Sequence, residues 1–112
     1  CAIVDVNGLQ IDGATADVMP SEPLDKKFAA FNWNVIPVDG HDYTALAEAF
    51  AAAASCKEKP TVLLAKTVKG RGVSFMEGDY GWHGKAPNAE QYEKARAELA
   101  ARVAELEGEN HG

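Results

Sequence analysis

Three short apolar runs alternate with segments of helical periodicity, and this alternation limits the possible fold more than any other feature. Residues 1–6 and 61–67 are almost entirely apolar, and residues 35–38 form a third run. Such runs are typical of strands in parallel sheets that are covered on both faces. The order strand, helix, strand, helix, strand, helix predicts an α/β fold with a three-layer parallel sheet and helical crossovers. Pro37 places the run 35–38 at an edge or an end of the sheet.

The helical segments carry apolar residues at spacings of three and four, which predict one buried stripe on each helix. We expect the first helix to open at Pro20 or Ser21 and to end by residues 32–34. Asp42 can cap the second helix, and a third helix is expected over residues 89–106. The expected stripes are Leu24, Phe28 and Phe31, then Tyr43, Leu46, Ala47, Phe50 and Ala54, and finally Tyr92, Ala95, Leu99, Val103 and Leu106.

Two segments show neither a strand-like apolar run nor helical spacing of apolar residues, and they are predicted to be loops. Residues 12–20 follow the first run, and residues 68–87 form a longer, glycine-rich stretch that we expect to be functional or mobile. The polar end, residues 108–112, is expected to fray from the last helix, and His111 within it to have no function. Because the chain opens without Met and inside a predicted strand, we expect it to be a piece of a longer protein, with an unpaired edge on that strand.

The composition indicates one soluble, acidic domain. Of the 112 residues, 46% are hydrophobic and 25% are charged, and the net charge of −6 argues against a nucleic-acid surface. No apolar run reaches the roughly 18 residues of a membrane helix, and no signal peptide is visible. Cys1 and Cys56 are expected to be free thiols rather than a disulfide. The expected compartment is therefore the cytoplasm.

The first predicted strand stops abruptly at Asn7 and Gly8. The chemistry of open parallel sheets collects just past the carboxyl ends of the strands, and Asn7 is the first residue past this end. Its amide oxygen suits Mg²⁺, which proteins hold with a few oxygens beside the phosphates of a cofactor. A strand followed by Asn-Gly is also an ordinary turn signal, so a plain turn stays open. Asp5, inside the strand, is expected to be buried and to support the Asn7 turn.

Four sequence blocks follow one another in an order that is familiar from one enzyme family. They are DVNGLQIDGAT at residues 5–15, VDGHD at 38–42, KPTVLLAKTVKGRGVSFME at 59–77 and GWHGKAPN at 81–88. The first block looks like the second half of the thiamine diphosphate motif of transketolases. The chain resembles the amino-terminal subunit of split, two-chain transketolases most. This resemblance implies that residues 1–112 are a partial thiamine diphosphate-binding domain of the pyrophosphate type, the carboxyl-terminal half of that fold.

The resemblance also implies roles for single residues. In transketolases the matching Asn side chain, here Asn7, binds the metal that clamps the diphosphate, and the carbonyl of the residue matching Leu9 binds it too. The residue matching Ile11 packs near the cofactor rings. The matching His of the His-Gly-x-x-Pro setting is His83, which the resemblance makes a catalytic residue that binds cofactor and substrate hydroxyls. From the residues alone, His83 could equally be a surface histidine of a loop.

Two further features are not part of the predicted site, and two other motifs are absent from the sequence. The segment 69–72, Lys-Gly-Arg-Gly, has the composition of a phosphate-binding loop, but a solvated turn is commoner for such a segment. His41 follows a predicted strand end, yet capping by Asp42 explains that turn more simply. The sequence has no Cys or His cluster with zinc spacing and no serine-centred nucleophile elbow.

The implied function is transfer of a two-carbon ketol unit from a ketose phosphate to an aldose phosphate, with thiamine diphosphate and Mg²⁺ as cofactors. The family's leading Gly-Asp-Gly, whose aspartate is a metal ligand, is absent from this sequence, as is an activating glutamate from another domain. We therefore expect the chain alone to be inactive and to act with a carboxyl-terminal subunit or a second protomer.

Several alternatives stay open. One is another thiamine diphosphate enzyme, such as a dehydrogenase subunit or a deoxyxylulose-phosphate synthase. Two more are a sugar-specific relative of transketolase and a non-catalytic assembly module. A different doubly wound nucleotide binder would need a G-x-G-x-x-G turn, which the sequence lacks.

Overall fold

The computed structural model describes residues 1–109, and their contacts group into two compact units. The first unit is Cys1–Gly8 with Ala14–Thr67, and the second is Leu9–Gly13 with the described residues from Val68 onward. Residues 110–112 of the predicted polar tail, including His111, lie outside the described residues. No helix within residues 1–109 combines the length and the apolar character that a membrane span requires.

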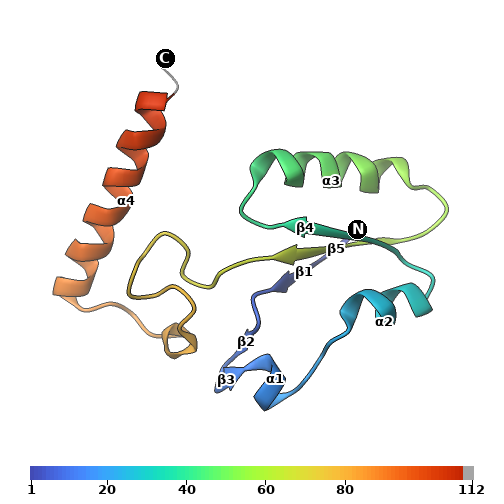
Figure 1. Ribbon diagram of the computed structural model, residues 1–112, viewed down its shortest axis with the longest axis horizontal. Helices are drawn as coiled ribbons and strands as arrows, with labels where there is room; N and C mark the ends of the chain where they lie inside the picture. Colours follow the sequence, from blue (N-terminus) through green and yellow to red (C-terminus); the bar gives the residue numbers. More distant parts are fainter. Residues whose placement is uncertain (110–112) are drawn as a thin grey trace. The chain divides into compact units, whose positions relative to one another are not determined.

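A three-stranded parallel sheet forms the centre of the first unit (Figure 1). Its strands β1 (Ala2–Val6), β5 (Thr61–Lys66) and β4 (Asn34–Asp39) lie in the order β1-β5-β4. The register pairs the last residues of β1 and β4 with the last residue of β5, so all three carboxyl ends lie at one edge. The predicted parallel sheet is confirmed. β1 and β4 are its outer strands, as expected for a first strand without an outer neighbour and for a strand that contains Pro37.

Helices cover both faces of this sheet and complete the predicted three layers. α3 (Tyr43–Ser55) and α2 (Leu24–Ala30) both contact β4 and β5, and they lie on opposite sides of the sheet in Figure 1. Alternation along β5 agrees with this arrangement: Leu63 packs with Ala49 of α3, whereas Leu64 lines a cavity beside α2. Leu63 is fully buried, at 0% exposure, because the central strand is covered from both faces.

The buried stripe of α3 differs from the predicted one. Ala45, Ala49 and Ala53, four residues apart, pack with Leu46 against the core. Of these four residues only Leu46 belongs to the predicted stripe. The other residues of the predicted stripe are exposed, namely Tyr43, Ala47, Phe50 and Ala54. This helix has two apolar sides, and periodicity cannot choose between them. The side with small residues faces the sheet because it lets the helix lie close.

α2 begins later than predicted. Its first residue is Leu24 rather than residue 20 or 21. Pro23 accounts for the delay, since a proline disfavours helical geometry at the residue before it. Leu24 and Phe28 are half-buried, as predicted, but Phe31 is 81% exposed because the helix has ended before it.

The turn between β4 and α3 is held by a cap and by close packing. The Asp42 side chain accepts a 3.0 Å hydrogen bond from Ala45 N, which confirms the predicted cap. Gly40 N donates to Lys66 O at 2.8 Å. A Cβ on Gly40 would lie 2.5 Å from Cγ2 of Thr67 and 3.1 Å from Lys66 O. Glycine is therefore required here so that β4 can approach the end of β5.

The residues after β1, including most of the predicted loop 12–20, contain short regular elements instead. β2 (Leu9–Gln10) and β3 (Gly13–Ala14) form a two-stranded sheet, and α1 (Thr15–Val18) is a single helical turn. Strands of 2 residues and a helix of 4 residues give no periodicity that a sequence pattern could reveal. The cysteines behave as predicted, since Cys1 and Cys56 are both free thiols.

Most of the second unit is α4 (Ala89–Glu109) and the irregular segment before it, which includes the short 3-10 helix η1 (Tyr80–Trp82). α4 starts where predicted but continues through Gly108 and Glu109, so the predicted fraying from residue 108 is wrong for these two residues. The irregular segment covers only part of α4. In the predicted stripe Ala95 is half-buried, whereas Tyr92, Leu99, Val103 and Leu106 are 42–55% exposed.

We predict that Gly40→Ala destabilises the first unit by about 1–3 kcal/mol, the usual cost of overpacking. The added methyl group would push Thr67 and the end of β5 away from β4. Gly108→Ala is the matched control, because a Cβ at Gly108 meets nothing within 4 Å. Urea unfolding should show a lower midpoint for Gly40→Ala and an unchanged or higher one for Gly108→Ala. Equal midpoints for the two variants would contradict the close approach.

Candidate functional site

A cavity of about 390 Å³ opens at the carboxyl ends of β1 and β5 in the first unit. Asn7 lines it, directly after the last residue of β1, and Lys66 and Thr67 line it at the end of β5. Asn7 thus faces an open space at the edge of the sheet where ligands of parallel-sheet proteins bind. This is the placement that the sequence predicted for Asn7.

The backbone turns sharply at Gly8 to leave this edge. Gly8 has a φ of 74°, a conformation that glycine adopts without steric cost. Because a Cβ there would meet nothing within 4 Å, the backbone angle rather than space requires the glycine. The Gly8 carbonyl accepts a 2.8 Å hydrogen bond from Thr15 N, which ties the turn to the first residue of α1.

Asp5 supports the end of β1, but not in the predicted way. Its side chain is exposed rather than buried, because β1 is an outer strand. The Thr67 hydroxyl donates a hydrogen bond to Asp5 Oδ1, and Thr67 N donates to Val6 O at 3.3 Å. These bonds fasten the end of β1 to the residue that follows β5. The support for Asn7 therefore runs through the neighbouring strand.

The cavity is largely apolar but carries both signs of charge. Leu24 and Leu64 contribute apolar side chains, while Lys66 and Glu22 contribute an ammonium and a carboxylate group. One Glu22 oxygen already accepts a 2.9 Å hydrogen bond from Leu24 N. Lys66 gives an anionic ligand a counter-charge in this setting. The sequence-based prediction did not include Lys66, although Lys66 lies near the end of the predicted strand 61–67 and is the last residue of β5.

The donor set fits Mg²⁺ in part. Among residues 1–109, no group of three or more His, Cys, Asp or Glu side chains is placed to hold a metal ion. The cavity offers the Asn7 amide and the partly engaged Glu22 carboxylate. Mg²⁺ usually takes one or two carboxylates together with substrate phosphates. The described residues can therefore contribute to a magnesium site but do not complete one.

His83 is exposed and directly follows η1 in the second unit. Asp79 caps this short helix by accepting a 2.8 Å hydrogen bond from Gly81 N. His83 N donates at 3.0 Å to the carbonyl of Tyr80. The backbone of His83 is thereby fixed while its imidazole is accessible to a ligand.

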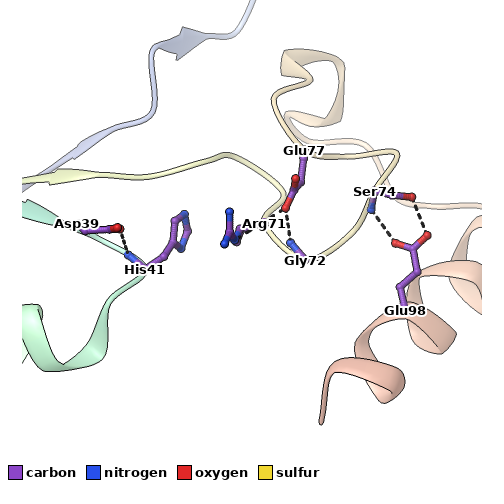
Figure 2. A network of polar contacts seen from close by, with 7 residues as sticks. All are labelled: Asp39, His41, Arg71, Gly72, Ser74, Glu77 and Glu98. Atoms are coloured by element: carbon purple, nitrogen blue, oxygen red, sulfur yellow. Dashed lines mark hydrogen bonds and ion pairs between the residues drawn. The ribbon is translucent and has the colours of Figure 1, made fainter. Parts of the chain in front are cut away.

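The segment from Lys69 to Gly72 is closed on itself rather than open for a phosphate. Gly72 N donates to Glu77 Oε1 at 2.9 Å, and Arg71 Nε lies 4.0 Å from the same oxygen (Figure 2). A Cβ on Gly70 would lie 2.5 Å from Met76 O. Contacts within the segment thus occupy the Gly72 N–H, which a phosphate cradle would need, in agreement with a turn.

The remaining predicted site residues lie in the second unit. Leu9 is half-buried in β2, and Ile11 is 65% exposed in the turn that follows. Asn7 belongs to the first unit, whereas Leu9, Ile11 and His83 belong to the second. Their convergence on one ligand stays a prediction.

Comparison with known proteins places this geometry in a family. Residues 1–105 match the family described as transketolase, thiamine diphosphate binding domain. An apulose-4-phosphate transketolase subunit of Phocaeicola vulgatus is 41% identical over 111 residues, which cover 99% of this chain and 40% of that protein. The 6-deoxy-6-sulfo-D-fructose transketolase subunit SqwG of a Clostridium species is 40% identical over 98 residues, or 88% of this chain and 36% of that protein.

A solved structure agrees with these relatives. The crystal structure of transketolase from Campylobacter jejuni matches 88% of this chain and 15% of that chain, with a TM-score of 0.79 and 29% identity. The chain spans 40% or less of the length of these three proteins. Since the family match covers nearly the whole chain, this chain belongs to the transketolase thiamine diphosphate-binding domain family.

Proposed function

We propose that residues 1–112 are part of a thiamine diphosphate-binding domain in a transketolase. The reaction is transfer of a two-carbon ketol unit from a ketose phosphate to an aldose phosphate. The observation that carries this proposal is the cavity at the carboxyl ends of β1 and β5, with Asn7 on its wall. Family membership supplies the cofactor class, and the cavity supplies a place at the sheet edge where such a ligand can bind.

In this proposal the predicted site residues and Lys66 have distinct tasks. The Asn7 amide and the Leu9 carbonyl bind the Mg²⁺ that holds the diphosphate, and Ile11 packs near the cofactor rings. Lys66 adds a positive charge to the cavity that Asn7 lines. When bound, thiamine diphosphate supplies the carbon nucleophile and the electron sink of the reaction. His83 donates hydrogen bonds to the diphosphate and to substrate hydroxyls, and it can move a proton at those hydroxyls.

A partner is part of the proposal because the resemblance implies an activating glutamate from another domain, which residues 1–112 do not include. We infer that a carboxyl-terminal subunit or a second protomer completes the enzyme. The relatives from Phocaeicola and Clostridium are themselves named as subunits, which supports this arrangement. The free thiols of Cys1 and Cys56 suit a reducing compartment, and we propose the cytoplasm.

A sugar-specific transketolase is the second candidate function. Two relatives are named for apulose-4-phosphate and for 6-deoxy-6-sulfo-D-fructose, both less common ketoses. Assay of the assembled enzyme with xylulose 5-phosphate and with these two ketoses separates the candidates. A deoxyxylulose-phosphate synthase would instead condense pyruvate with an aldose phosphate, and an assembly module would turn over none of these substrates.

We predict that Asn7→Ala weakens binding of Mg²⁺ and thiamine diphosphate to the assembled enzyme by about tenfold or more. The variant removes one metal ligand and leaves the sheet intact. Asn34→Ala is the matched control, since Asn34 donates to Thr61 Oγ1 at 3.2 Å at the opposite, amino end of the sheet. Titration calorimetry should show a loss for Asn7→Ala alone. Equal affinities for the two variants would remove Asn7 from the site.

We predict that His83→Ala lowers kcat/KM for the ketose phosphate by about 10²-fold, in the range of one acid–base group. His41→Ala serves as the control. His41 lies in a turn where its backbone N–H, which the variant keeps, donates to Asp39 Oδ1 at 2.9 Å (Figure 2). Steady-state kinetics should show less than a twofold change for His41→Ala. An equal loss of kcat/KM in both variants would contradict a specific role of His83 in the reaction.

We predict that the 112-residue chain alone catalyses no ketol transfer, because its Mg²⁺ ligands are incomplete. The test incubates the chain with a ketose phosphate, an aldose phosphate, thiamine diphosphate and Mg²⁺, and it measures product by mass spectrometry. The positive control is the full-length protein assembled with its partner, because the aspartate ligand that the resemblance implies is absent from residues 1–112. Turnover by the isolated chain would show that its metal site is complete.

A further inference from the structure

A bidentate contact joins α4 to the irregular segment of the second unit. Ser74 N donates to Glu98 Oε2 at 2.7 Å, and Ser74 Oγ donates to Glu98 Oε1 at 2.7 Å (Figure 2). Hydrogen bonds to a carboxylate are stronger than neutral ones, and two together fix the direction of approach. Glu98 thus holds the middle of an otherwise irregular segment against a long helix.

Aromatic contacts continue this connection from Ser74 toward His83. Phe75, the next residue, packs edge-on against Trp82 with ring centroids 5.5 Å apart and planes at 60°. Trp82 Nε1 also donates to Phe75 O at 3.1 Å. Trp82 is the direct neighbour of His83 in the sequence. The backbone at residues 74–75 therefore sets where the residue before His83 lies.

A second residue of α4 reinforces the same contacts. Lys94 Nζ lies 4.0 Å from Glu98 Oε1 and 5.3 Å from the centre of the Phe75 ring. We call the Ser74–Glu98 contact the brace. The irregular segment is also closed on itself, because Gly78 N donates to Lys69 O at 2.9 Å. The segment that leads to His83 is thus tied to α4 and to itself without an extensive apolar core.

We propose that Glu98 is a positioning residue for His83, acting through Ser74, Phe75 and Trp82. This inference rests on the proposed function, since it assumes that His83 meets the cofactor and the substrate. A histidine that donates hydrogen bonds in a transition state must be held in place beforehand, because small displacements cost catalysis heavily. Glu98 holds Ser74 in place from the long helix α4.

The ionisation of Glu98 gives this brace a characteristic pH dependence. The hydrogen bond from the Ser74 hydroxyl, then the bond from its backbone and the charge of Lys94, lower the pKa of Glu98 below its usual 4.5. A lowered pKa means that the stabilisation is full above pH 4.5 and is lost as pH falls through the folded-state value. Among residues 1–109, Lys94 is the charged group within ion-pair distance of Glu98, and the irregular segment presents the neutral Ser74.

The test uses the full-length protein assembled with its partner and compares Glu98→Gln with Glu93→Gln. Both variants remove one carboxylate from α4, but the ion pair of Glu93 within residues 1–109 is with exposed Arg96, at 3.4 Å. Hydrogen exchange of residues 68–83 measures the brace itself. Kinetics at saturating thiamine diphosphate and Mg²⁺, with the ketose phosphate varied, measures its effect on His83.

For Glu98→Gln we expect exchange of residues 68–83 to rise about tenfold. We expect kcat to fall about three- to tenfold and KM for the ketose phosphate to rise by no more than the same factor, because Glu98 orients His83 and does not itself bind ketose. Glu93→Gln should match the wild type in both measurements. The exchange difference between wild type and Glu98→Gln, corrected for intrinsic rates, should be full above pH 4.5 and should shrink as pH falls through the lowered pKa of Glu98.

The outcomes separate this proposal from the proposed function. Unchanged exchange in Glu98→Gln, or an equal rise in Glu93→Gln, overturns the brace even if the wild type is an active transketolase. A rise in exchange with an unchanged kcat overturns the link from Glu98 to His83. If the assembled wild type binds no thiamine diphosphate, the proposed function fails, and the positioning role of Glu98 fails with it.

Discussion

The parallel pairing of β5 with a strand on each side is the constraint on which the first unit depends. Because β1 and β4 both run alongside β5 in register, their carboxyl ends stop at one edge. The chain then leaves that edge after β1 and after β5, and residues at these two strand ends line the cavity at Asn7 together with Glu22 and Leu24. Gly40 lies close to Thr67 where the ends of β4 and β5 meet, and Thr67 in turn lines the cavity, so strand pairing positions this wall of the site.

The sequence predicted those features that depend on local patterns. The three strands, the Asp42 cap and the position of Asn7 past β1 could be predicted because apolar runs and capping residues report directly on backbone conformation. The buried side of α3 could not, since alanines and larger apolar residues occupy two adjacent sides of the helix. Choosing between them requires the sheet, which is a tertiary partner.

Other features escaped prediction because they join residues far apart in the chain. The Thr67–Asp5 hydrogen bond spans 62 residues, and the Ser74–Glu98 pair spans 24. Nothing in the sequence near Glu98 distinguishes it from the other glutamates of α4. The two units also differ in how they are stabilised. Among the described residues, the second unit has a single buried hydrophobic side chain, Val73, and relies on polar ties and one aromatic pair.

The alanines by which α3 meets the sheet have a consequence for how this chain can vary. The helix packs on the core through three small residues, Ala45, Ala49 and Ala53. A larger residue at one of these positions would move the helix away from the sheet and displace the adjoining turn. Tyr43 lies on the other apolar side of the helix, is 88% exposed and does not have this size limit. The two sides of α3 therefore differ in how they tolerate substitution. The side that packs on the sheet accepts only small residues, whereas the exposed side accepts residues of other sizes and polarity without moving the strand ends.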